Sequence, residues 1–156
     1  MNQVITRLLV AFGLVVAASG ALASGAGIPI ETWPAERGRS FASLQNGARL
    51  FANYCMGCHS LKFQRYERTA DDLLIPHDVM LENIIFTGQK IGEQMTVAMA
   101  PELAKNWFGA PPPDLTMVER VRGAEWIYNY LKTFYIDPSR PLGVNNKVFP
   151  NVAMPH

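Results

Sequence analysis

The pattern of hydrophobic and polar positions predicts a helix that begins near residue 41. Its hydrophobic residues recur at intervals of three and four: Phe41, Leu44, Ala48, Phe51 and Cys55. This spacing places them on one helical face, and Ser40, which precedes the first of them, is a favourable N-cap. The pattern therefore predicts a helix that delivers Cys55 to a buried, hydrophobic surface.

The next stretch is less regular. Residues 71–86 have a weaker helical pattern that Pro76 interrupts. Three of its hydrophobic residues are expected to pack inward: Leu81, Ile84 and Ile85. Residues 87–110 contain several glycines and a proline and indicate no single element. The three prolines at 111–113 require an extended backbone, because proline fixes its own φ and restrains the residue before it.

A last helix is predicted after the prolines, where Thr116 and Glu119 fit a T-x-x-E capping box. Its hydrophobic positions are Val118, Val121, Ile127, Leu131 and Phe134. Gly123 lies among them as a break or a point of close packing. Five prolines and glycines within residues 137–155 then predict a long irregular loop, of the kind that usually serves a function. Since no run shows sustained strand alternation, the fold class predicted is mainly α.

Composition limits the kind of protein. With 49% hydrophobic and only 17% charged residues, the chain has enough apolar surface for a core and is not a disordered tail. Its 156 residues suffice for one domain. The formal charge of +1 gives no basic field for nucleic acid, so no nucleic-acid partner is expected.

The N-terminal residues read as a secretory signal peptide. A short segment with one base is followed by an apolar run over residues 8–18 and by the small-x-small motif Ala21-Leu22-Ala23. The alternative is an uncleaved anchor, but the run is short for a span of about 20 residues. We therefore predict a signal peptide at 1–23 and one domain at 24–156.

The chemistry of the chain is concentrated in Cys55-Met56-Gly57-Cys58-His59, a C-x-x-C-H motif for covalent haem attachment. Thiols at i and i+3 lie on nearly one side of a helical turn, where they can bond to two vinyl groups on one porphyrin edge. The imidazole that follows can ligate the iron. Two cysteines in an oxidising compartment would normally form a disulfide, but the histidine that follows Cys58 at once favours haem attachment. A thioredoxin-like or zinc site also uses a cysteine pair, but it calls for a strand–helix context or a second pair.

The second axial ligand of the iron is left open by the residues alone. Met99 and Met154 are both closely followed by proline, and His77 would give bis-histidine ligation. Met80 and Met95 fit core packing better. A methionine ligand makes a six-coordinate electron carrier. An open position would instead indicate a haem peroxidase or gas sensor.

Three segments, in order, resemble the signatures of the cytochrome c1 family. Residues 55–66 resemble its haem-binding segment. Residues 112–115, followed by 120–123, resemble its second signature, and the stretch from Phe149-Pro150 to Met154-Pro155 resembles its axial-methionine loop. The resemblance covers about residues 30 to 156. It implies a c-type cytochrome fold, mainly helical, with long irregular loops around one covalently attached haem c.

The resemblance also implies site residues. Met154 matches the family's axial ligand and, with His59, would complete the metal site. Arg122 would pair with a haem propionate, and Pro113 would line the haem edge. Cys55 and Cys58 remain the points of attachment.

For the whole protein, the resemblance implies the electron-transfer haem subunit of the cytochrome bc1 complex, a ubiquinol–cytochrome c oxidoreductase. Such a subunit performs no substrate chemistry of its own. Its implied partners are cytochrome b, the Rieske iron–sulfur protein as electron donor and a soluble cytochrome c as acceptor. The implied location is the bacterial inner membrane, with the haem domain on the periplasmic side.

Two expectations remain beside that reading. The family continues into a transmembrane helix after the methionine loop, so we expect the sequence to be incomplete and its membrane anchor to be absent from this chain. The alternative is a free-standing soluble periplasmic cytochrome c, an electron shuttle. A further alternative is a thiol–disulfide protein without haem, which would be colourless when expressed with haem-attachment machinery.

Overall fold

The computed structural model describes residues 29–156, so the predicted signal peptide lies outside the described residues. The helical elements are η1 (Arg37–Arg39), α2 (Phe41–Leu50), η2 (Phe51–Cys55), α3 (Tyr66–Asp72), α4 (His77–Asn83), α5 (Pro101–Phe108), α6 (Val118–Arg122) and α7 (Ala124–Lys132). The strands are β1 (Leu61–Arg65), β2 (Gln94–Met95), β3 (Phe134–Ile136) and β4 (Val144–Asn146). This part of the chain is mainly helical, as predicted. None of its helices has the length and hydrophobicity that crossing a membrane requires.

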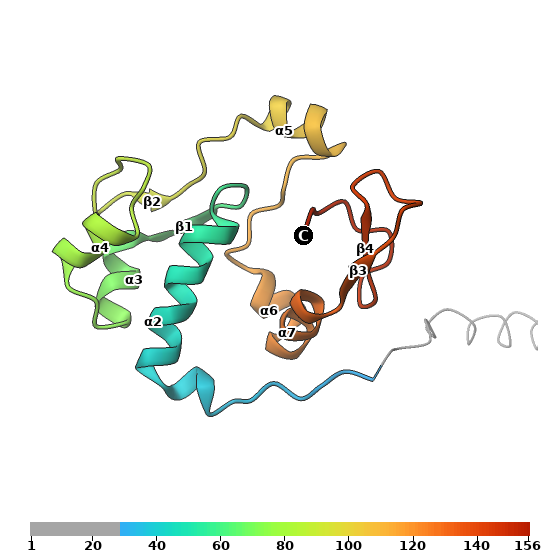
Figure 1. Ribbon diagram of the computed structural model, residues 1–156. Coiled ribbons are helices and arrows are strands. Elements are labelled where there is room, and N and C mark those ends of the chain that lie inside the picture. Colours follow the sequence, from blue (N-terminus) through green and yellow to red (C-terminus); the bar gives the residue numbers. More distant parts are fainter. Residues whose placement is uncertain (1–28) are drawn as a thin grey trace, which may run out of the picture.

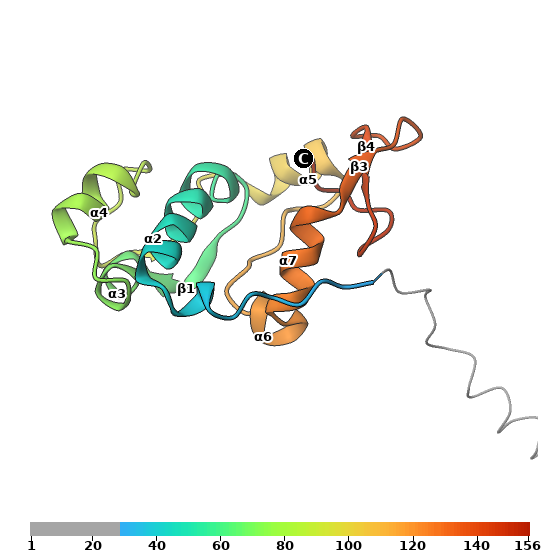
Figure 2. The ribbon, with the colours of Figure 1, turned by 60° about the horizontal axis from the view of Figure 1, so that its bottom comes forward.

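The elements form two lobes joined in a ring (Figure 1). The first lobe, residues 41–95, contains α2 to α4 and the β1–β2 pair. The second lobe, residues 118–146, contains α6, α7 and the β3–β4 pair, and the extended segment before α6 runs between the lobes. The C-terminal end lies in the middle of the ring. The turned view shows the same two lobes on either side, with β1 and α2 facing the α6–α7 pair (Figure 2).

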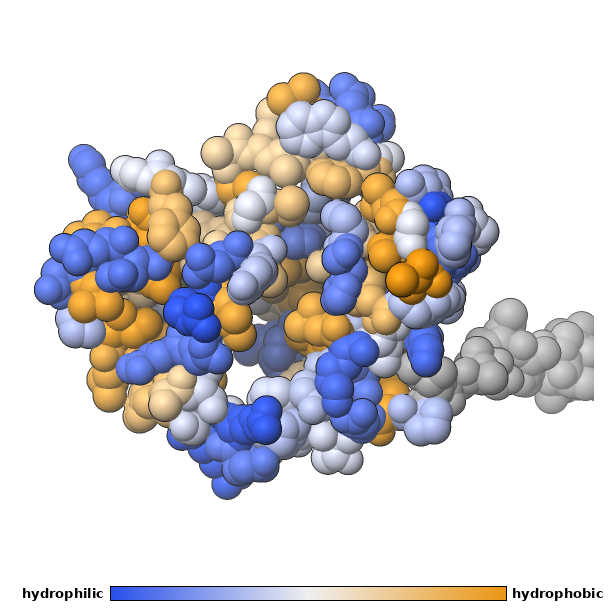
Figure 3. Space-filling model, in the orientation of Figure 1, coloured by the Kyte–Doolittle hydropathy of each residue, from blue (hydrophilic) through white to orange (hydrophobic). Residues whose placement is uncertain are grey.

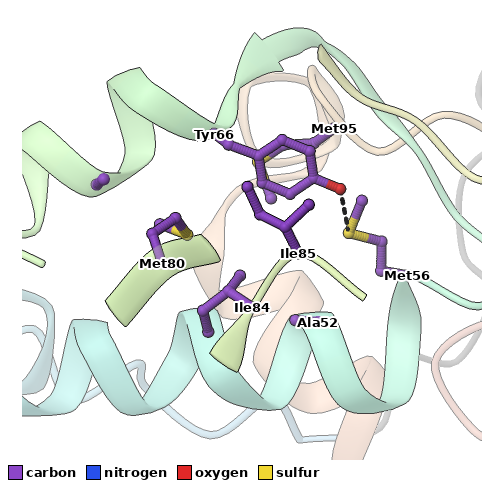
Figure 4. Packing of buried hydrophobic residues seen from close by; sticks show 8 residues of the cluster. Ala52, Met56, Tyr66, Met80, Ile84, Ile85 and Met95 are labelled. Carbon is purple, nitrogen blue, oxygen red and sulfur yellow. Dashed lines mark hydrogen bonds between the residues drawn. The ribbon is translucent and has the colours of Figure 1, made fainter. Parts of the chain in front are cut away.

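The core of the first lobe surrounds one tyrosine. Tyr66 has no exposed surface and lies between α2, α4 and β2 (Figure 4). Its hydroxyl lies 3.6 Å from the sulfur of Met56, inside the C-x-x-C-H motif. The buried cluster consists of Ala52, Met56, Tyr66, Ala70, Met80, Ile84, Ile85 and Met95. The core of this lobe therefore supports the turn that carries the two cysteines.

The predicted first helix is present, but only its C-terminal end is buried. Ser40 is its N-cap, as predicted, and its hydroxyl accepts a hydrogen bond from the Ser43 N–H at 3.5 Å. The helix continues into the π-turn η2, whose last residue is Cys55. Phe41 and Leu44, on the shared hydrophobic face, are exposed, whereas Ala52 near the other end is buried. The buried core of the lobe meets the helix near Cys55, and the Gln45 amide on α2 donates to the Leu73 carbonyl at 2.8 Å.

The second predicted stretch, residues 71–86, contains the last two residues of α3 and the whole of α4. It is interrupted as predicted, and Pro76 is the N-cap of α4. Ile84 and Ile85 are buried, as predicted. Leu81 is exposed, so its predicted inward packing was wrong. Met80 and Met95 are core residues, with 0% and 3% of their surfaces exposed, as their apolar surroundings predicted.

The last predicted helix is two helices that meet at Gly123. Its φ of +84° is a backbone conformation that glycine adopts without strain, and it ends α6. The predicted capping box was wrong, since Met117 is the N-cap and the Thr116 hydroxyl accepts a hydrogen bond from the Phe63 N–H instead. Two of the hydrophobic helical positions, Val121 and Leu131, are exposed. Beyond α7, the predicted helical position at Phe134 lies in β3.

The region predicted as an irregular loop contains a strand. Antiparallel pairing joins β3 to β4, and Tyr135 lies opposite Asn145 in that pair. The strands escaped the sequence pattern because each has only three residues, too few for alternation to show. The remainder, residues 147–156, is irregular, as predicted, and we call it the methionine loop.

Two buried asparagines hold the methionine loop to the second lobe. Asn146 is 1% exposed, and its side-chain carbonyl accepts hydrogen bonds from the N–H groups of Val148 and Phe149 at 2.9 and 3.0 Å. Its amide donates to the Tyr130 carbonyl at 2.7 Å. The Asn145 carbonyl accepts from the Asn151 N–H at 2.8 Å. Two short side chains thus replace the regular backbone pairing that the loop lacks.

Asn146→Ala is predicted to lower the free energy of unfolding by about 2–4 kcal/mol, because buried backbone groups would lose their partners. The measurement is denaturant unfolding of the full protein. Asn83→Ala is the matched control, since the Asn83 amide bonds the Val79 carbonyl at an exposed site. Equal, small losses in the two variants would contradict the role given to Asn146.

Candidate haem-binding site

The two thiols and the imidazole project from a single turn at the end of η2. The carbonyl of Cys55 accepts hydrogen bonds from the N–H groups of Cys58 and His59 at 3.1 and 2.9 Å. That closes a helical turn, so the thiols at i and i+3 project to similar sides of it. Both cysteines are free thiols and half-buried. The turn can therefore present two sulfur atoms to one edge of a flat ligand.

Burial, and then the neighbouring sulfur of Cys58, raises the pKa of the Cys55 thiol. The protonated Cys55 thiol carries both the sulfur and the hydrogen that a vinyl group would take up in forming a thioether. Metal binding by thiolates, in contrast, favours a lowered pKa.

The His59 ring is fixed by a backbone carbonyl from another part of the chain. It is 8% exposed, and its Nδ1 lies 2.8 Å from the carbonyl oxygen of Pro113. Because a carbonyl can only accept, Nδ1 carries the proton and donates it. Nε2 then keeps its lone pair. This is how metal-ligating histidines are usually oriented in proteins.

The segment that carries Pro113 is clamped beside β1 by its neighbours. The Leu115 N–H donates to the Ser60 carbonyl at 2.9 Å. Asp114 accepts hydrogen bonds from the N–H groups of Lys62 at 2.7 Å and Thr116 at 3.1 Å. The extended backbone predicted for the prolines lets the segment run alongside the turn, so that the Pro113 carbonyl reaches His59.

Met154 lies half-buried in the methionine loop, next to α7. Its sulfur accepts a hydrogen bond from the Tyr130 hydroxyl at 3.3 Å. The other open candidates lie elsewhere: Met99 precedes α5, and His77 is exposed at the start of α4, where its Nε2 lies 2.8 Å from Asp71. The Asp71 carboxylate raises the pKa of His77. Met154 is the candidate whose loop is held to the second lobe.

Arg122 ends α6 and is exposed, and its guanidinium lies 5.0 Å from the centre of the Trp126 ring. Stacking on an indole stabilises an arginine while leaving its N–H groups free to bind an anion. Its pairing with a haem propionate stays a prediction.

The residues present fit a c-type haem. The surface is hollowed between the two lobes, with hydrophobic side chains at its rim (Figure 3). The first lobe brings two free thiols and an imidazole with Nε2 available, and the second brings a thioether. A soft sulfur and a nitrogen are the donor set of a six-coordinate c-type haem iron.

Several residues of the site were not found from the sequence. The partner of His59 is a backbone carbonyl, and such groups carry no residue identity. Asp114 lies inside a recognised signature, yet its hydrogen-bonding role had no local signal. Tyr130 was not among the predicted site residues, although its hydroxyl contacts the sulfur of Met154.

Comparison with known proteins gives two close relatives. The chain is 48% identical over 150 residues to cytochrome c1 of Allochromatium vinosum, which covers 96% of this chain and 61% of that protein. It is 44% identical over 133 residues to the ammonia monooxygenase gamma subunit of Nitrosomonas europaea, which covers 85% of this chain and 56% of that protein. The chain thus spans about three fifths of the length of the curated relatives it matches. No protein-family model matches it.

Asp114→Asn is predicted to weaken the clamp beside His59 by about 1 kcal/mol, since an amide cannot accept at both of its atoms and the site is partly exposed. Burial raises the pKa of Asp114, but hydrogen bonds from Lys62 and Thr116 outweigh it and hold that pKa below its usual value. The ionised carboxylate therefore stabilises the fold above its unfolded pKa. That contribution is lost as the pH falls through the lower, folded pKa.

Unfolding measured at neutral and acidic pH tests this prediction. The stability difference between the native protein and Asp114→Asn should be largest near neutrality and shrink at acidic pH. Asp78→Asn, on the exposed first turn of α4, is the control. A difference that stays constant across this pH range would contradict the role of the carboxylate.

Proposed function

The chain belongs to the cytochrome c1 family and carries a c-type haem, and on that premise we propose that it is the electron-transfer haem subunit of a ubiquinol–cytochrome c oxidoreductase. The observation that carries the proposal is the pairing of the C-x-x-C-H turn with a clamped histidine and a methionine loop on the opposite lobe. Bound haem supplies a reversible one-electron couple. The protein's part is to hold it, shield it and set its potential.

Four side chains would hold the group. Cys55 and Cys58 would form the thioether bonds, which prevent its loss from an exported protein. His59 would ligate the iron through Nε2, since the Pro113 carbonyl occupies Nδ1. Met154 would be the second axial ligand, and a thioether in that position raises the reduction potential.

Two further residues would act at the haem edge. Arg122, held over Trp126, would pair with a propionate, because an anion at a partly buried edge needs a cation nearby. Pro113 would lie against the ring edge while its carbonyl orients His59.

The partners follow from the family. Electrons would arrive from the Rieske iron–sulfur protein and leave to a soluble cytochrome c, and cytochrome b would be the membrane-embedded neighbour. The haem domain would lie on the periplasmic side of the inner membrane, attached by an anchor that residues 29–156 do not contain. This segment would perform no substrate chemistry of its own.

Purification of the tagged, full-length protein from detergent-solubilised membranes of its own organism tests the proposed assembly. Cytochrome b and a Rieske iron–sulfur protein should co-purify with it, and ubiquinol should reduce its haem. Recovery with oxygenase subunits instead would favour the role named for the Nitrosomonas relative. Recovery alone, in the soluble periplasmic fraction, would favour a free electron shuttle.

Met154→Leu is predicted to leave the haem attached, because both thioether bonds remain. The reduction potential should fall, and carbon monoxide or cyanide should bind the opened iron rapidly. The measurements are a redox titration and visible spectra with each ligand. Met99→Leu is the control and should behave as the native protein does. An unchanged spectrum and potential in Met154→Leu would rule Met154 out.

A further inference from the structure

One contact joins α7 to the sulfur of the proposed axial ligand. The Tyr130 hydroxyl lies 3.3 Å from the sulfur of Met154, across 24 residues of sequence. A thioether has no hydrogen to donate, so the hydroxyl is the donor. The contact is therefore a hydrogen bond directed at a lone pair of the sulfur.

Aromatic neighbours hold the Tyr130 ring in place. Trp126, one turn earlier on α7, stacks on it with ring centres 4.9 Å apart and planes 12° apart. Phe134 and Phe149 meet it edge to face, at 5.2 and 6.5 Å between ring centres. Phe149 belongs to the methionine loop, like Met154. The cage thus fixes the donor relative to the loop that carries the acceptor.

The backbone of Tyr130 is tied to the same loop. Its carbonyl accepts a hydrogen bond from the Asn146 amide at 2.7 Å, and the Asn146 side-chain oxygen accepts from the N–H groups that open the loop. The Tyr130 hydroxyl therefore contacts the loop directly, and its carbonyl is connected to the loop through Asn146. Both contacts fix Tyr130 relative to the sulfur of Met154.

From these contacts we infer that Tyr130 is a positioning residue that sets both the orientation and the donor strength of the Met154 thioether. The inference rests on the proposed function, in which Met154 ligates the haem iron. A thioether sulfur has two lone pairs, so one can face the metal while the other accepts the hydroxyl hydrogen. The hydrogen bond draws electron density from the sulfur. A weaker donor stabilises the oxidised iron less, so the bond raises the reduction potential.

The test is Tyr130→Phe in the full, haem-loaded protein. Phenylalanine keeps the caged ring and removes only the hydroxyl. Covalent haem and the methionine-to-ferric-iron charge-transfer band should persist, while the reduction potential falls below that of the native protein. Tyr128→Phe is the matched control on the same helix. The Tyr128 ring packs on Trp33 and the Tyr128 hydroxyl accepts from Lys132, so the reduction potential of this variant should equal that of the native protein.

A double variant separates the hydrogen bond from packing. In a Met154→Leu background no sulfur is left to accept, so adding Tyr130→Phe should shift the potential no further. If the same drop persists in that background, Tyr130 acts by packing and the inference is overturned. An unchanged potential in Tyr130→Phe, with the charge-transfer band present, also overturns it and leaves Met154 ligation standing. If the native protein lacks that band, the ligation proposed above fails, and this inference fails with it.

Discussion

The hydrogen bond from His59 Nδ1 to the Pro113 carbonyl joins segments 54 residues apart, at the place where the two lobes meet. It determines which ring nitrogen holds the proton and which way the imidazole faces. Forming it requires the extended prolines, the carboxylate of Asp114 and the Leu115–Ser60 backbone bond in register beside β1. The turn that presents the thiols thus depends on a clamp from the other half of the chain.

The other side of the hollow is organised by different means. The methionine loop has little regular pairing of its own, and a buried asparagine side chain satisfies its first N–H groups. Tyr130, within an aromatic cage, adds a donor to the sulfur of Met154. One lobe therefore offers a rigid nitrogen and two thiols, and the other offers a loop whose sulfur is held by hydrogen bonding. An electron carrier that changes charge without changing shape needs the groups on both sides of the hollow to be fixed beforehand.

The geometry of the Cys55–His59 turn could be predicted from the sequence because covalent attachment of haem would dictate its spacing. Two thiols and an imidazole within five residues leave little choice of geometry, and Ser40 and Gly123 act through purely local backbone rules. Sequence prediction failed where a distant partner competes for a side chain. The Thr116 hydroxyl accepts a hydrogen bond from the Phe63 N–H of β1 and does not cap the helix as predicted. The role of the Pro113 carbonyl could not be predicted for another reason: the carbonyl belongs to the backbone, which every residue shares. Short strands paired across a turn likewise carry too few residues to show alternation.

The central claim is that one turn, Cys55 to His59, holds a haem through two thioether bonds. The intact mass of the exported protein, measured under denaturing conditions after expression with haem-attachment machinery, tests it most directly. The account predicts a mass greater than that of the processed polypeptide by one haem. A single species with the mass of the bare polypeptide would contradict it.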